Sequence, residues 1–172
     1  MIRRIFRAAA ILTLSLSIQI LRGQEMHSPT NSSPAFDQLK SLAGTWEGKK
    51  GSGALVKVTY EVVSNGSVVM ERMHPSNEAE MITMYSLDGN RLVATHYCSV
   101  GNQPTLQTGA LTGATGKYDF HYVMVAGTKT PDEGHMIALS VSILDKDHLT
   151  QTWTFQDHGK SLNDSFSYTR VK

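Results

Sequence analysis

Short runs rich in β-branched and aromatic residues recur from residue 45 to the end of the chain, and clusters of turn-forming residues separate them. The turns include SNG at 64–66, DGN at 88–90 and DHGK at 157–160, whose Asn, Asp and Gly residues favour tight hairpins. We predict about ten strands, at 45–50, 54–63, 67–74, 80–87, 91–99, 105–111, 117–125, 135–144, 148–156 and 161–171. Because nearly all the links are short and no helical segment lies among them, the strands should form sequential antiparallel hairpins.

Alternation within these runs indicates that each strand has one buried and one solvated face. The runs at 54–63 and 135–144 alternate apolar with polar residues along most of their length. An open sheet of ten strands would expose two edges and tend to curl, whereas closure satisfies the backbone at both edges. The sequence therefore predicts an all-β fold, an up-and-down antiparallel barrel, with a two-sheet sandwich as the alternative.

A short helix is expected immediately before the first strand. Ser33 has the character of an N-cap and Pro34 that of a first-turn residue, and Phe36, Leu39 and Leu42 follow at helical spacing. Gly44 should end this segment.

The N-terminus has the character of an export signal. Residues 1–7 are basic, and the apolar stretch that follows is shorter than the roughly 20 residues of a membrane-spanning helix. We expect a signal peptide at 1–23, a flexible leader at 24–33 and one barrel domain at 34–172, with a secreted or periplasmic location. An uncleaved signal anchor is the alternative.

Composition narrows the choice of partners. Lys and Arg number 16 against 15 Asp and Glu, a formal net charge of +1, so the chain lacks the basic surplus that nucleic-acid binding requires. Cys98 is the single cysteine, which leaves no intrachain disulfide to stabilise an exported domain. The oligomeric state does not follow from these features.

The stretch LAGTWEGKKGSG at 42–53, which follows the expected helix and opens the first strand, resembles the Gly-x-Trp start of the calycin superfamily. The closest likeness is to the nitrobindin and bacterial lipocalin-like branch, and TYEVVSNGSVVMER also resembles exported bacterial proteins of unknown function in that group. The resemblance implies a barrel closed at its base by Trp46, with Arg170 from the final strand over the indole. An Arg–Trp contact of this kind contributes about 0.5 to 2 kcal/mol.

The same resemblance raises haem as a cofactor. In nitrobindins a histidine of the last strand ligates the iron, but SLNDSFSYTRVK at 161–172 contains no histidine. His158 lies just before this strand in a predicted turn, so the ligand role does not carry over to it.

His96 and Cys98 lie two residues apart on one predicted strand and therefore share a face with Leu92 and Ala94. We assign this face to the interior, where His96 would line a cavity and Cys98 would be a small apolar filler. A metal site would need a third ligand such as His121, and no metal-ligand spacing completes the set, so no metal is predicted. A catalytic Cys–His pair lacks an oxyanion loop.

Arg72 is a second candidate, because burial of its face of the strand at 67–74 would direct a guanidinium toward a ligand carboxylate. The alternative is that Arg72 lies near the rim and pairs with an acidic residue. Tyr97 and Tyr122 are further candidates for polar groups of the cavity wall.

Three functional hypotheses remain open. The first is an exported barrel that holds a small apolar or amphipathic molecule. The second is a hydrolase or isomerase that uses His96 as a base. The third is an envelope structural or interaction protein whose barrel is filled by its own side chains.

Overall fold

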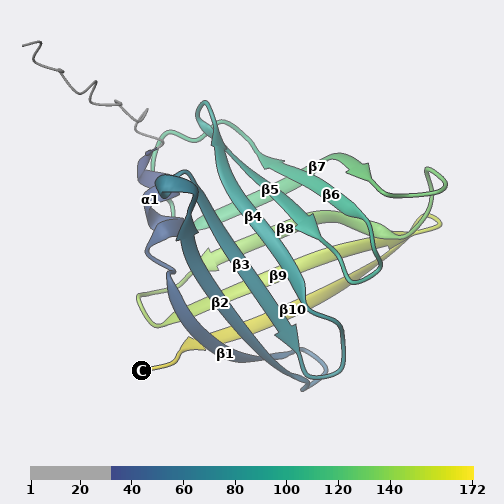
Figure 1. The fold of residues 1–172 in the computed structure, drawn as a ribbon, viewed down its shortest axis with the longest axis horizontal. Coiled ribbons are helices and arrows are strands. Elements are labelled where there is room, and N and C mark those ends of the chain that lie inside the picture. The colour runs from purple at the N-terminus through teal and green to yellow at the C-terminus, as the bar shows by residue number, and fades with distance from the viewer. Residues whose placement is uncertain (1–31) are drawn as a thin grey trace, which may run out of the picture.

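The ten predicted strands form one closed antiparallel barrel in the computed structural model, which describes residues 32–172 (Figure 1). Each strand pairs with its neighbours in sequence, and β1 pairs with β10 to close the wall. The predicted fold class is confirmed, and the two-sheet sandwich is wrong for this chain. The strands are β1 (Gly44–Lys50), β2 (Leu55–Val63), β3 (Val68–Pro75), β4 (Met81–Asp88), β5 (Arg91–Tyr97), β6 (Gln103–Thr108), β7 (Lys117–Ala126), β8 (His135–Ile143), β9 (His148–Asp157) and β10 (Lys160–Arg170).

Strand β6 departs most from its predicted range, since it begins at Gln103 and includes Pro104. Proline has no N–H and is usually excluded from central strands. Pro104 is tolerated because the pairing between β5 and β6 ends at Thr105, so Pro104 pairs only with β7.

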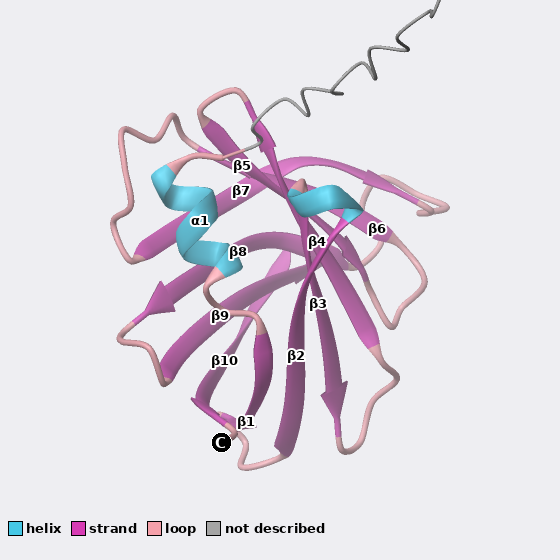
Figure 2. Ribbon diagram, turned by 60° about the vertical axis from the view of Figure 1, so that its left-hand side comes forward, coloured by secondary structure: helices cyan, strands magenta, loops and turns pink. Residues whose placement is uncertain are grey.

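One end of the barrel is covered by helix α1 (Pro34–Lys40), as Figure 2 shows. The Ser33 side chain accepts a hydrogen bond from the backbone N–H of Phe36 at 3.1 Å, which is the expected N-cap. Phe36, Leu39 and Leu42 are fully buried against the barrel core. The residues immediately before β1 therefore close this end of the barrel.

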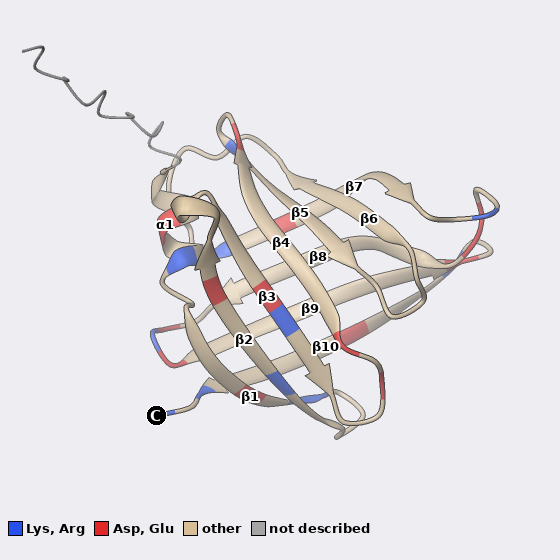
Figure 3. Cartoon of the chain, viewed as in Figure 1, with Lys and Arg blue, Asp and Glu red and all other residues tan. Residues whose placement is uncertain are grey.

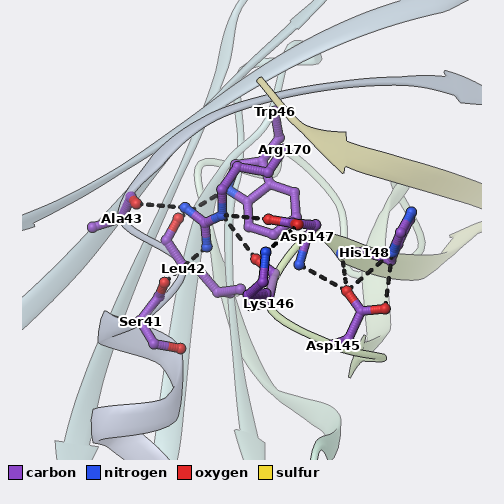
Figure 4. Close-up of polar contacts among 9 residues, drawn as sticks. All are labelled: Ser41, Leu42, Ala43, Trp46, Asp145, Lys146, Asp147, His148 and Arg170. Carbon is purple, nitrogen blue, oxygen red and sulfur yellow. Dashed lines mark hydrogen bonds and ion pairs between the residues drawn. The ribbon is translucent and has the colours of Figure 1, made fainter. Parts of the chain in front are cut away.

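Trp46 and Arg170 meet at the same closed end (Figure 4). The guanidinium carbon of Arg170 lies 4.2 Å from the centroid of the Trp46 ring, and the indole Nε1–H donates to the Leu42 carbonyl at 2.8 Å. Arg170 also donates to the carbonyl oxygens of Ser41, Ala43 and Lys146 at 2.8 to 2.9 Å. One arginine thereby connects β10 to the residues that follow α1 and to the β8–β9 turn.

The glycine of the Gly-x-Trp stretch has a physical role in this arrangement. Gly44 has φ of +132°, and a Cβ atom at this position would lie 2.9 Å from Nη1 of Arg170. Glycine is thus required both by its backbone conformation and by the approach of the guanidinium.

Among residues 32–172, Lys and Arg are interspersed with Asp and Glu along the strands and loops (Figure 3). Within residues 32–172, no helix is long and apolar enough to cross a bilayer. The predicted signal peptide at 1–23 and the leader at 24–33, apart from its last two residues, lie outside the described part of the chain.

Candidate functional site

A cavity of about 160 Å³ lies inside the barrel at the end opposite to α1. Its walls come from the ends of β1, β3, β5 and β9 and from the starts of β4, β8 and β10, which an antiparallel barrel brings to one rim. Most of the wall is apolar. The lining residues are Lys50, Met73, Pro75, Glu78, Met81, His96, Cys98, Ser99, Val100, Met136, Trp153, Phe155, Leu162, Asp164 and Phe166.

His96 is the buried polar residue of this cavity, and it is only 2% exposed. Its Nδ1 lies 3.0 Å from the hydroxyl of Thr83, and its ring packs at 4.5 Å, centroid to centroid, against Trp153. Its Nε2 is buried and has no hydrogen-bond partner among residues 32–172. A buried nitrogen in this state costs free energy unless a guest or a water molecule satisfies it.

A polar cluster centred on Glu71 lies deeper in the barrel. The Tyr85 hydroxyl donates to Glu71 Oε2 at 2.7 Å, and the Gln151 amide donates both to the same oxygen and to the Tyr60 hydroxyl at 2.9 Å. The strand register sets Tyr60, Glu71, Thr83 and His96 side by side across β2 to β5. The polar cluster therefore extends along one row to the cavity.

Burial controls the protonation of this row. Desolvation raises the pKa of Glu71, although the hydrogen bonds from Tyr85, Gln151 and Tyr60 oppose the shift. Desolvation, and then the neighbouring Glu71, raise the pKa of Tyr60 and Tyr85 well above the usual range. Desolvation lowers the pKa of His96 to about 4. The imidazole is therefore neutral at physiological pH.

An ion-pair network lies at the cavity mouth. Lys50 Nζ lies 2.8 Å from Asp164 and 3.2 Å from Glu78, and the hydrogen bond to Asp164 is the main cause that raises the pKa of Lys50. Two carboxylates against one ammonium leave an excess negative charge at this point.

Arg72 does not line the cavity, so its prediction as a cavity-wall residue is wrong, and the pairing with an acidic residue, which was the alternative, is the one observed. Val69, Glu71 and Met73 form the buried row of β3, and Arg72 points outward and pairs with Glu80 at 3.2 Å. Either row would have placed a charged residue inside the barrel. The difference is that Glu can be neutralised by a proton, whereas Arg stays charged at any physiological pH.

The other predicted wall residues divide into two groups. His96 and Cys98 line the cavity, and the row of Leu92, Ala94 and His96 is buried as expected. Tyr97 and Tyr122 are 47% and 45% exposed and do not line it. Tyr97 belongs to the outward-facing row of β5. The Tyr122 ring packs against the His135 ring, with 5.2 Å between the ring centroids.

Sequence reasoning missed Glu71 and Trp153, and the hairpin register contained the signal for Glu71. Residues paired across neighbouring strands share a face, and Tyr60 pairs with Glu71 as Val58 pairs with Met73. Inward-facing Val58 and Tyr60 thus require inward-facing Met73 and Glu71. The strand considered alone did not reveal this.

The cavity does not fit a haem. Its volume of about 160 Å³ is below the roughly 300 to 1,000 Å³ of pockets for drug-sized ligands. His158 is exposed in the β9–β10 turn, where it pairs with Asp157. It does not line the cavity and is therefore not placed to ligate an iron there. The described chain, 32–172, contains no group of three or more His, Cys, Asp or Glu residues placed to hold a metal ion, and His121 is exposed on β7.

A second hollow, of about 310 Å³, lies along the outside of β1 and β2, where Glu47, Lys57 and His74 line it. It is larger, but none of the buried unpartnered atoms found in residues 32–172 belongs to it. We therefore regard the internal cavity as the candidate site.

Comparison with known proteins supports the architecture only. The chain matches no protein-family model, and no curated protein sequence matches it. A solved structure of a protein of unknown function from the DUF3598 family of Nostoc punctiforme is similar, with a TM-score of 0.53 at 11% identity. The match covers 78% of this chain and 49% of that one, so the chain spans about half the length of this neighbour. A closed ten-stranded antiparallel barrel fits a calycin-like fold.

The lowered pKa of His96 predicts how stability changes with pH. At His96, the unfolded chain binds a proton near pH 6.5 and the folded chain only near pH 4. The free energy of unfolding is therefore unaffected by this group above pH 6.5 and falls as the pH drops toward 4. The loss of unfolding free energy between pH 6.5 and pH 4 is on the order of 3 kcal/mol. Relative to a His96→Gln variant, the wild type should lose stability over this range in urea unfolding.

Imidazole NMR titration supplies the control for this prediction. His96 should remain neutral at pH 5, whereas Asp157, and then Asp132, raise the pKa of exposed His158. Protonation of His96 near pH 6.5 would contradict the predicted burial.

Proposed function

We propose that this protein binds a small, largely apolar molecule in the cavity at the open end of its barrel. The observation that carries the proposal is the buried Nε2 of His96, which has no partner in the described residues and lies in an otherwise mainly apolar cavity. Sites for small molecules combine apolar walls with a few polar groups that fix orientation. Trp153, which packs against the His96 ring, and Phe166 supply aromatic surface to the same cavity.

The size of the cavity limits the guest. An engineered cavity of about 150 Å³ in another protein stays dry and binds benzene. The present cavity, of about 160 Å³, accordingly suits one ring or a short chain, with room for a longer molecule to project through the mouth.

The likeness of LAGTWEGKKGSG to calycins supports this role, because the superfamily is known for barrels with internal ligands. Membership in that superfamily is part of the proposal, as is export directed by residues 1–23. The guest would then be met in the periplasm or outside the cell.

Catalysis by His96 as a general base is less well supported than binding. A general base works best when its pKa lies near the working pH, and burial lowers the pKa of His96 to about 4. At neutral pH such an imidazole accepts a hydrogen bond but holds an abstracted proton poorly.

Titration with toluene, followed by backbone amide NMR, tests the proposal. We expect saturable shifts at His96, Met73 and Trp153. A Met136→Trp variant, which fills the cavity from β8, should abolish them. As the matched control, Leu144→Trp adds the same side chain at a 64% exposed position and should leave binding unchanged. If toluene shifts no cavity residue, or binds equally well to Met136→Trp, the proposal fails.

A further inference from the structure

Three sulfur-containing side chains lie next to one another in the cavity wall, on the neighbouring strands β3 to β5. Met73 of β3 pairs directly with Met81 of β4. The last pair between β4 and β5 is Ile82 with Tyr97, and one residue further the same register sets Met81 opposite Cys98. Residues that lie opposite each other on antiparallel strands have Cβ atoms about 4.5 to 5.5 Å apart. Two thioethers and one thiol therefore form one row, and all three line the cavity.

His96 adds a nitrogen to this row. It precedes Cys98 by two residues, and both side chains line the cavity. The imidazole is 2% exposed, and its Nε2 has no hydrogen-bond partner within residues 32–172. The cluster therefore contains a buried donor atom that lacks a partner, in addition to its sulfur atoms.

The other imidazole nitrogen is held in a way that suits a metal ligand. His96 Nδ1 lies 3.0 Å from the Thr83 hydroxyl, which can either donate or accept a hydrogen bond. An ion on Nε2 would place the imidazole hydrogen on Nδ1, from which the Thr83 oxygen can accept it. Binding of an ion therefore does not depend on which tautomer predominates without it.

The kind of donor atom determines the kind of ion. Thiolate and thioether sulfur select soft ions such as Cu(I), whereas a structural zinc ion takes four ligands, commonly Cys and His. Cys98 and His96 are the only Cys or His residues of the cluster. Residues 32–172 contain no group of three or more His, Cys, Asp or Glu residues that could hold a metal ion. The two methionines are thus what would complete a ligand set, and they favour a soft ion.

The charge of the site favours a monovalent ion. When the Cys98 sulfur bonds to the ion, the thiol proton passes to the solvent and the ion keeps its oxidation state. A thiolate and a monovalent cation are neutral together, whereas a divalent ion would leave a positive charge in a mainly apolar cavity. At the mouth, Glu78 and Asp164 outnumber Lys50, and their excess negative charge attracts cations.

We infer that this cluster binds one soft monovalent metal ion of the Cu(I) type. The ligands are the Cys98 thiolate, His96 Nε2 and the thioethers of Met73 and Met81. This site goes beyond the proposed function and does not rest on it, because all its ligands belong to the chain itself and the ion needs no apolar guest.

Silver tests the inference, because Ag(I) shares the charge and softness of Cu(I) and is stable in air. Native mass spectrometry in chloride-free buffer should show one Ag(I) per chain, and calorimetry at neutral pH should show Zn(II) binding far more weakly. Loss of an outer-shell partner typically costs about 10- to 100-fold in metal affinity, so removal of a ligand in Cys98→Ser should cost at least about 100-fold.

The chain offers a matched control for the methionines. Met70 pairs with Met84 across the same two strands, but neither residue lines the cavity. The double variant Met73→Leu/Met81→Leu should bind Ag(I) at least about tenfold more weakly than the wild type. The double variant Met70→Leu/Met84→Leu should bind it as the wild type does. Leucine nearly conserves the volume of methionine, so both variants should fold.

The methyl groups of the methionines give a second readout. In ¹³C NMR, one equivalent of Ag(I) should shift the methyl signals of Met73 and Met81 and leave that of Met124, which is 53% exposed, in place. Cys98→Ser binding as tight as that of the wild type, equal losses in the two double variants, or Zn(II) binding as tight as Ag(I) binding overturns the inference.

The titration of metal-free protein with toluene reports on the proposed function separately. Failure of silver to bind leaves the apolar guest site standing, and failure of toluene to bind leaves the metal site standing.

Discussion

A Glu71→Ala variant is expected to lose about 3–5 kcal/mol of unfolding free energy. The substitution removes the common acceptor of Tyr85 and Gln151 and leaves their donors buried without a partner, in addition to opening a void beneath the cavity. Urea unfolding monitored by circular dichroism measures the loss. The matched control is Glu61→Ala, which removes an exposed carboxylate from the neighbouring strand and should cost less than about 0.5 kcal/mol. Equal stabilities of the two variants would contradict the role of Glu71.

Glu71→Gln gives a further test, because glutamine imitates the protonated carboxyl group. Burial raises the pKa of Glu71 from 4.5, so the folded state holds its proton more strongly than the unfolded chain does. The contribution of Glu71 is complete below pH 4.5 and is lost as the pH rises through the folded-state pKa. Between pH 5 and pH 8, the wild type should lose stability relative to Glu71→Gln. A wild type that gains stability relative to this variant would show that the hydrogen bonds outweigh desolvation.

Trp46→Ala should destabilise the barrel by about 3–5 kcal/mol, since Trp46 is fully buried at the closed end. The loss combines the void with the contact to Arg170 and the hydrogen bond to the Leu42 carbonyl. Trp46→Phe retains most of the volume and should cost less. Thermal and urea unfolding measure both variants.

The matched control for Trp46 is Leu162→Ala, which truncates a side chain that is 71% exposed and should cost less than about 1 kcal/mol. If Trp46→Ala is as stable as Leu162→Ala, the closed end does not depend on the indole.

Much of the fold could be predicted from the sequence because the signals were local. Turn residues such as SNG at 64–66 marked the hairpins, alternation marked the strands, and Ser33 with Pro34 marked the helix start. The contact between Trp46 and Arg170 is the one that the resemblance to calycins implied. These features depend on near neighbours in sequence or on one pairing, that of β1 with β10.

The candidate site was less predictable because it depends on register and irregularity. Both faces of β3 carried a charged residue, and only pairing with β2 decides that Glu71 lies inside. Strict alternation counted from buried Leu139 and Val141 would place Met136 on the outer face, whereas the register shift between Met136 and Ala138 places it in the cavity wall. A β-bulge changes which residues face inward, and the sequence of β8 does not mark it.

The occupancy of the cavity can be measured most directly through Trp153, which lies in its wall, once Trp46 has been replaced by phenylalanine. Trp153 is then the single tryptophan and reports on its own surroundings. Titration with toluene, with excitation restricted to the indole, should change its emission in a saturable manner, and a Met136→Phe substitution, which fills the cavity from β8, should reduce the response. Emission that is unaffected by toluene at concentrations that saturate the amide shifts would mean that the guest binds elsewhere, and the account of the site would be wrong.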